Sequence, residues 1–237
     1  MVRREGPGSL AELAELAEQV RPVSLVGDQG LPVLGAFESL IPGAGLRRGS
    51  TVGVGALPGV TGTTSLALAL VAGASRNGSW VAAVGFRSLG LVAADELGVA
   101  LERLVLVADP GRGRREGERA GWPAVVAALV DGFDVVLVGA EACARLRATD
   151  ARRLVARVRE RGTVLVGVGA ELPGERSPLR LTVAAASWRG LGEGWGHLRG
   201  RRVTVEATGR GDAARPRRGE LWLPGPNGGV QAIEPVT

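Results

Sequence analysis

The chain has 237 residues, 45% of them hydrophobic, which suits one large α/β domain with a sizeable core. Its single cysteine, Cys143, excludes an internal disulfide, and its apolar runs are too short for a membrane-spanning helix. The basic N-terminus has no apolar core of a secretory signal, so we expect a cytoplasmic protein that makes no contact with a membrane.

The formal net charge is +5, and all 29 basic residues are arginine because the sequence contains no lysine. Such a balance fits contact with nucleic acid or with an acidic partner. A chain rich in alanine, glycine, valine and arginine but devoid of lysine is equally typical of a GC-rich genome. The charge alone therefore does not assign a partner.

The N-terminal segment carries a helix signal. The pattern Ser9-Leu10-Ala11-Glu12 is a capping box, and apolar residues at helical spacing continue to about Val20. A short strand is expected at residues 23–26. We divide the chain into an N-terminal arm, residues 1–26, and a core, residues 27–237.

The core alternates buried strands with helices. Residues 31–48 are expected to be mostly turn, with a short helix around 36–40. Strands are predicted from Ser50, from Ser79, before Asp109, from Asp134 and from Thr163, with helices at about 63–75, 92–97, 122–131 and 150–162. Alternation of this kind predicts a mainly parallel sheet. From about Leu179 onward, glycine turns separate segments that are typical of antiparallel strands, so the fold class is α/β with an antiparallel C-terminal extension.

The stretch GALPGVTGTTSLALAL, residues 55–70, has the order of a phosphate-binding loop: a strand, a glycine-rich turn, two threonines and a helix. In the pattern G-x-x-x-x-G-K-[ST], lysine reaches the β- and γ-phosphates and the hydroxyl holds Mg²⁺. Thr63 stands where the lysine belongs, and Leu57 stands where the first glycine belongs. The sequence therefore predicts a vestigial loop that leaves only weak nucleotide binding open, made of Gly55, Gly59, Gly62, Thr63 and Thr64.

The strand that would supply a Mg²⁺-binding aspartate is altered as well. It ends in Gly139-Ala140, Glu141 follows too late, and Asp134 lies at its opposite end. A single histidine and a single cysteine make neither a metal site nor a catalytic triad. We therefore expect no catalytic residue, no metal and no cofactor.

These elements resemble the core of the recombinase RecA over roughly residues 9–230. The resemblance implies a RecA-like core, and it places Phe86 at the position of RecA's water-activating glutamate. Gly169-Ala170 replaces the polar pair that senses the γ-phosphate. The DNA-binding loop that follows is cut to residues 171–178, so we expect DNA contact to be weak or indirect.

A RecA-like core with an eroded ATP site resembles the actinobacterial ImuA-prime family. That family belongs to the SOS-type, DNA-damage-induced mutagenesis cassette. The resemblance implies a non-catalytic accessory protein in translesion synthesis. Its implied partners are an ImuB-like inactive Y-family polymerase relative and an error-prone DnaE-type polymerase.

Two other interpretations remain open. The first is a divergent RecA-family ATPase in which an arginine such as Arg47 or Arg87, or one from a neighbouring subunit, replaces the lysine. The second is an ATP-independent DNA-binding module that uses basic surfaces.

Several residues are candidates for partner contact. An arginine stripe between residues 145 and 161 offers a basic surface or an ordinary solvated helix face, and it contains Arg145, Arg152, Arg153, Arg157 and Arg159. Tryptophans around a glycine-rich turn, and the apolar residues of the N-terminal arm, offer protein contacts or cover the core: Trp188, Trp195, Leu13, Leu16, Val23 and Leu25. In RecA the equivalent arm docks on the next protomer, so a homo-oligomer is possible here. Without ATP to bridge the interface, long filaments are not expected, which leaves a monomer, a dimer or a hetero-complex.

Overall fold

The computed structural model describes residues 30–41, 43, 45–107, 121–191 and 196–234, with nothing stated of the side chain of residue 191. The N-terminal arm expected at residues 1–26 lies outside these ranges, as do Leu13, Leu16, Val23 and Leu25.

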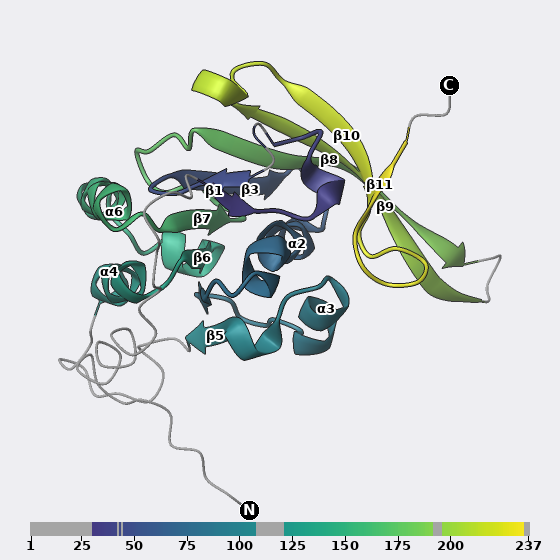
Figure 1. The fold of residues 1–237 in the computed structure, drawn as a ribbon, viewed down its shortest axis with the longest axis horizontal. Helices are drawn as coiled ribbons and strands as arrows, with labels where there is room; N and C mark the ends of the chain where they lie inside the picture. The colour runs from purple at the N-terminus through teal and green to yellow at the C-terminus, as the bar shows by residue number, and fades with distance from the viewer. Residues whose placement is uncertain (1–29, 42, 44, 108–120, 192–195, 235–237) are drawn as a thin grey trace, which may run out of the picture.

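The described residues form a nine-stranded mixed sheet (Figure 1). Across the sheet the strands follow the order β11 (Gln231–Ile233), β10 (Arg217–Trp222), β9 (Gly196–Gly209), β8 (Leu179–Leu191), β3 (Thr51–Ala56), β7 (Val164–Val168), β6 (Val135–Gly139), β4 (Val81–Val84) and β5 (Leu104–Val107). Strands β3 to β7 run parallel to their neighbours, and β8 also runs parallel to β3. Strands β8 to β11 pair antiparallel with one another. The predicted α/β class, with a mainly parallel sheet that passes into an antiparallel extension, is confirmed.

Helices cover both faces of the parallel part. Helices α2 (Thr63–Arg76) and α3 (Leu91–Glu96) pack on one face, and α4 (Trp122–Gly132) and α6 (Ala148–Arg161) lie side by side on the other (Figure 1). Successive side chains of a strand point to opposite faces. In β6, accordingly, Val135 and Leu137 join the core around α2, whereas Val136 and Val138 join the core around α4 and α6. Burial on both faces explains why these strands are apolar without alternation.

The structure corrects the expectation for residues 31–48. They contain a short antiparallel pair, β1 (Gly30–Pro32) and β2 (Gly45–Arg47), and the expected short helix is a single 3₁₀ turn, η1 (Gly35–Phe37). Phe37, Leu40 and Ile41 pack into the core around α2. Two further 3₁₀ turns, η3 (Leu101–Arg103) and η4 (Gly211–Ala213), and a short helix, α5 (Ala140–Cys143), complete the described elements.

The far ends of β8 and β9 project past the rest of the sheet as a two-stranded ribbon (Figure 1). Residues 185–190 and 196–199 are exposed on this ribbon. No helix in the described parts of the chain is both long and apolar enough to cross a lipid bilayer.

Asp134, only 2% exposed, connects the amino-terminal ends of four strands. Its carboxylate accepts hydrogen bonds from Arg48 Nη1 at 2.9 Å, just before β3, and from the backbone N–H of Trp80 at 3.0 Å, just before β4. Its carbonyl accepts from the N–H of Val164, the first residue of β7, at 2.8 Å. Both carboxylate oxygens of this buried group are thus satisfied.

Replacing Asp134 by alanine should lower the free energy of unfolding by about 3 kcal/mol, because it leaves the Arg48 guanidinium and the Trp80 N–H without their acceptor. Urea denaturation measures the change. A matched control is Glu206→Ala, which removes an exposed carboxylate 3.6 Å from Arg218 and should cost less than about 1 kcal/mol. Equal losses for the two variants would show that Asp134 has no special role in holding the sheet.

Candidate functional site

The predicted strand–turn–helix is present. Strand β3 leads through residues 57–62 into α2, where the N–H of Leu66 donates to the carbonyl of Gly62 at 2.9 Å. Gly59 and Gly62 have φ angles of +78° and +118°, a region that favours glycine. Thr63 and Thr64 lie in the first turn of α2, half-buried. The loop therefore keeps the backbone plan of a phosphate-binding loop, including the positive end of the helix dipole.

An arginine that the sequence reading did not single out lies against this loop. Arg201 of β9 donates through Nη2 to the hydroxyl of Thr61 at 2.8 Å and also to the carbonyl of Thr61. A Cβ placed on Gly62 would lie 2.8 Å from both Nη atoms, so only glycine leaves room for the guanidinium beside the start of α2. The residues in contact are 140 positions apart in the chain. No local sequence pattern indicates such a contact.

The environment of Arg201 is unusual for a charged group. The residue is 5% exposed, its Nε is buried and has no hydrogen-bond acceptor within the described part of the chain, and its guanidinium lies 5.5 Å from the ring centre of Trp188. Burial lowers the pKa of Arg201 below its usual value. A cation beside a helix N-terminus is also opposed by the helix dipole. The carbonyl of Thr61 and the face of Trp188 offset part of this cost.

Of the two arginines proposed as replacements for the lysine, Arg47 lies at the opposite end of β3 from the loop, and Arg87 is paired with a carboxylate. Arg47 ends β2 and lines a cavity with Ser50 and Thr51, at the amino end of β3, whereas the loop follows the carboxyl end of that strand. Arg87 is exposed and forms an ion pair with Glu141 at 3.5 Å. The expectation that Arg47 could serve the loop is therefore wrong.

The carboxyl ends of β4 and β6 are closed by two glycines. A Cβ on Gly139 would lie 2.2 Å from the carbonyl oxygen of Gly85, and a Cβ on Gly85 would lie 2.4 Å from Cβ of Ala142. Gly85 also has a φ of +75°. An aspartate at residue 139 would thus require the backbone to move. The site for a Mg²⁺-binding acid is filled by packed backbone.

Glu141 and Phe86 stand at or next to the other positions that the resemblance to RecA assigns to catalysis. Glu141, at the start of α5, is held by Arg145 and Arg87, each at 3.5 Å. Phe86 packs against the hydrophobic core around α2. No group of three or more acidic, histidine or cysteine side chains suited to a metal ion occurs among residues whose placement is described. The residues present do not fit the chemistry of a Mg²⁺-nucleotide complex.

The connection between β7 and β8 is short, and contacts with β3 and β8 hold it in place. The N–H of Gly169 donates to the carbonyl of Val54 in β3 at 2.8 Å, and Glu171 forms an ion pair with Arg180. A Cβ on Gly53 would lie 3.5 Å from the carboxylate of Glu171, and a Cβ on Gly55 would lie 3.4 Å from the guanidinium of Arg180. This ion pair therefore lies against the two glycines of β3.

The arginine stripe on α6 does not form one surface. Arg157 and Arg161 bind Asp131 of α4, and Arg145 binds Glu141 and lies 6.0 Å from the ring of Trp122. Burial by itself would raise the pKa of Asp131, but the hydrogen bonds and charges of Arg157 and Arg161 outweigh it and lower that pKa below its ordinary value. Arg152 and Arg153 are exposed, whereas Arg159 faces a cavity.

Trp188 lies on the projecting ribbon and is 47% exposed, and Leu198 on the opposite strand is 49% exposed. Trp188 is therefore not covered by the sheet. Trp195 lies outside the described residues. Cys143 is buried, and burial raises the pKa of its thiol to about 11, so it stays protonated and is a poor nucleophile.

Comparison with known proteins gives two matches. The family model of the MT3502 N-terminal domain matches residues 39–174, a span that includes the loop and the parallel strands from β3 to β7. A protein of Mycobacterium tuberculosis, named uncharacterized protein Rv3395c, is 33% identical over 165 residues, which are 68% of this chain and 74% of that protein.

The close packing of Gly85 and Gly139 at the ends of β4 and β6 can be tested by substitution. Gly85→Ala should lower the free energy of unfolding by about 2–4 kcal/mol, because it adds a clash with Ala142 to the cost of a left-handed conformation. The matched control is Gly78→Ala, where φ is +89° but a Cβ meets nothing within 4 Å, so only about 1–2 kcal/mol is expected. Urea denaturation compares the two variants. A loss at Gly85 no larger than that at Gly78 would mean that the strand ends are not tightly packed.

Proposed function

This chain belongs to the family of the MT3502 N-terminal domain, and on that premise we propose that it is a non-catalytic, RecA-like accessory protein of DNA-damage-induced translesion synthesis. It acts in this proposal by binding other proteins. The finer assignment is to the ImuA-prime family.

The order of the strands supports a RecA-like core. Strand β3, which leads into the glycine-rich loop, lies inside the parallel sheet between β7 and β8. The sheet then continues into an antiparallel extension, as the resemblance implies. The mycobacterial relative supports an actinobacterial family.

The observation that carries the non-catalytic proposal is the closure of the strand ends by Gly85 and Gly139. Electrostatic stabilisation of the transferred phosphate and its metal is most of the catalysis in phosphoryl transfer. Here packed backbone replaces the metal-binding side chain, and Glu141 is engaged by two arginines. In this proposal the fold has no catalytic residues and serves as a scaffold for contacts with other proteins. Any contact with DNA would be weak or indirect.

The proposed partners are an ImuB-like inactive polymerase relative and an error-prone DnaE-type polymerase. The ribbon of β8 and β9 supports a docking role, because a two-stranded ribbon exposed on both sides is marginal on its own and carries two large apolar side chains, Trp188 and Leu198. A second copy of the chain is the alternative partner.

One observation favours a second candidate, nucleotide binding without hydrolysis. Arg201 brings a cation to the start of α2, where the missing lysine leaves none. It cannot supply the missing metal ligand or the missing base. This candidate therefore extends to binding and not to turnover.

We predict no ATP hydrolysis above background, with or without Mg²⁺, because the residues for metal and water activation are replaced. A phosphate-release assay on the purified chain measures it, with Thr64→Ala as the matched control because the hydroxyl at this position is the only part of the metal site retained. Mg²⁺-dependent turnover that is lost in Thr64→Ala would contradict the proposal. Titration with a non-hydrolysable ATP analogue, repeated on Arg201→Gln, tests the second candidate in the same preparation.

For the partner, we predict that the chain co-purifies with an ImuB-like protein and that Trp188→Ala weakens the complex by about 2 kcal/mol, roughly thirtyfold in affinity, as expected for an aromatic anchor. The matched control is Val92→Ala, since Val92 is 74% exposed on α3, which is not part of the ribbon. Failure to bind either cassette polymerase would refute the proposed function. An equal effect of the two substitutions would show that the ribbon is not the contact.

A further inference from the structure

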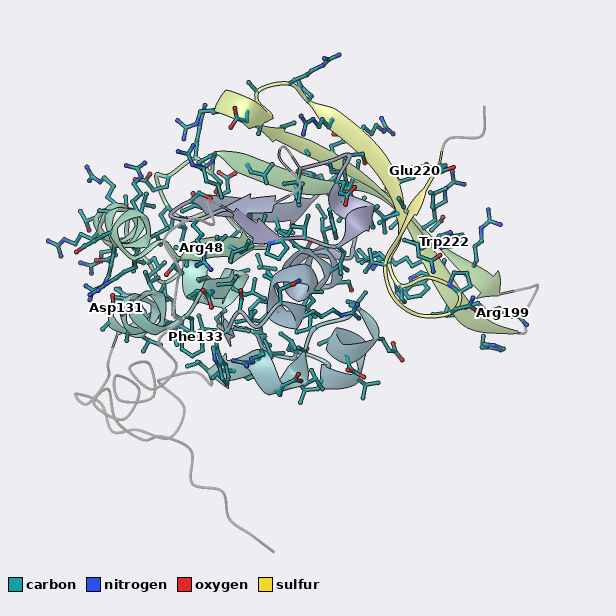
Figure 2. All side chains as sticks on the ribbon, viewed as in Figure 1. Arg48, Asp131, Phe133, Arg199, Glu220 and Trp222 are labelled. Carbon is teal, nitrogen blue, oxygen red and sulfur yellow. The ribbon has the colours of Figure 1, made fainter. Side chains whose placement is uncertain are left out.

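A strongly basic cavity lies at the amino end of β3, the end opposite the glycine-rich loop. Its volume is about 420 Å³, and its walls come from separate parts of the chain. The five arginines that line it are Arg47 at the end of β2, Arg48 after it, Arg159 of α6, Arg176 before β8 and Arg210 after β9. Arg48 lies on the side of the molecule away from Arg199 of the ribbon (Figure 2).

Packing between the segments that line the cavity brings their arginine residues together. Gly49, with φ of +71°, approaches α6 so closely that a Cβ would lie 3.3 Å from Cα and the carbonyl oxygen of Arg159. Arg210 donates through Nη2 to the carbonyl of Arg176 at 2.6 Å, and its N–H donates to the carbonyl of Pro178 at 2.9 Å. These contacts join α6, the β7–β8 connection and the end of β9 around one space.

The charges around this space are not balanced within the described residues. Arg48 is neutralised by Asp134, but no carboxylate in those ranges lies within 4 Å of the guanidinium groups of Arg47, Arg159, Arg176 and Arg210. The cavity lining contains one acid, Glu175. Like charges that the fold brings together repel one another, and a bound anion removes that cost.

We propose that this cavity binds a phosphate group. Guanidinium groups that approach from several directions need an acceptor with oxygens in several directions. A phosphate offers three strong acceptor oxygens and a charge near −2, whereas a carboxylate offers two oxygens in one plane. The phosphate belongs either to a nucleic-acid strand or to a small phosphorylated molecule. The site is separate from the glycine-rich loop and does not rest on the proposed function.

The probe for the experiment is pyrophosphate, titrated into the full chain by calorimetry at low salt. Arg159→Gln and Arg176→Gln should each weaken binding about fivefold or more, because each removes a charge-assisted hydrogen bond. Glu175→Gln should strengthen binding several-fold because it removes the opposing charge. Arg153→Gln, on the same helix but outside the cavity, is the matched control and should change affinity less than about twofold.

Arginine modification by phenylglyoxal gives a second measurement that needs no variant. Pyrophosphate should protect Arg159 and Arg176 from the reagent and leave Arg153 reactive, as read by peptide mass spectrometry. Absence of pyrophosphate binding, or binding that is equal in all variants, would overturn the proposal. Protection confined to Arg201 would overturn it as well, since the phosphate would then lie at the loop.

A competition distinguishes the two sources of phosphate. Displacement of pyrophosphate by a single-stranded oligothymidylate, with a salt dependence that weakens in Arg159→Gln, supports a nucleic-acid strand as the source. Pyrophosphate binding that the oligonucleotide does not displace supports a small phosphorylated molecule.

Discussion

The carboxylate of Asp134 is the interaction on which the rest of the sheet depends. It binds Arg48, three residues before β3, and the backbone N–H of Trp80, the residue before β4, while its own carbonyl accepts a hydrogen bond from the first residue of β7. Parallel strands that are buried on both faces have few polar groups with which to set their relative positions. One buried acid at their common edge does so here, and it also neutralises Arg48, one of the five arginines that line the basic cavity.

The two edges of the parallel sheet differ in the residues that they carry. At the carboxyl edge, where related folds place catalytic side chains, small residues allow backbone to pack against backbone, and Arg201 lies beside the loop. At the amino edge, long charged side chains surround an open space. Burial and close packing leave little space between the strand ends at the first edge. Charge and volume at the second edge are available for binding.

The sequence predicted the parts of the fold whose signal is local. Strands such as β6 and β7 are continuous apolar runs between glycines, and the turn before α2 has its own residue pattern, so both could be read directly. The pair β1 and β2 was missed because each strand has three residues and contains glycine or proline. The direction of β8 relative to β3 could not be read either, since no local pattern specifies which neighbour a strand pairs with.

From the sequence alone, the predictable features of the candidate site were the positions at which an expected residue is replaced by another. The loop motif defines the position of Thr63, and the resemblance to RecA assigns the positions of Phe86 and Gly139, so each departure from the expected residue is visible in the sequence. The contact of Arg201 with Thr61 and the convergence of Arg159, Arg176 and Arg210 depend on packing between distant segments. Both became evident only from the arrangement of the elements in space.

The use of arginine throughout has one more consequence for the cavity at the amino edge. A guanidinium does not give up its proton at any pH that a protein survives, and it is not a substrate for the acetylation that neutralises lysine. The positive charge around the cavity is therefore permanent, like that of a strong-base ion-exchange resin. Counterions in the solution screen this charge and thereby weaken the hold on an anion bound there.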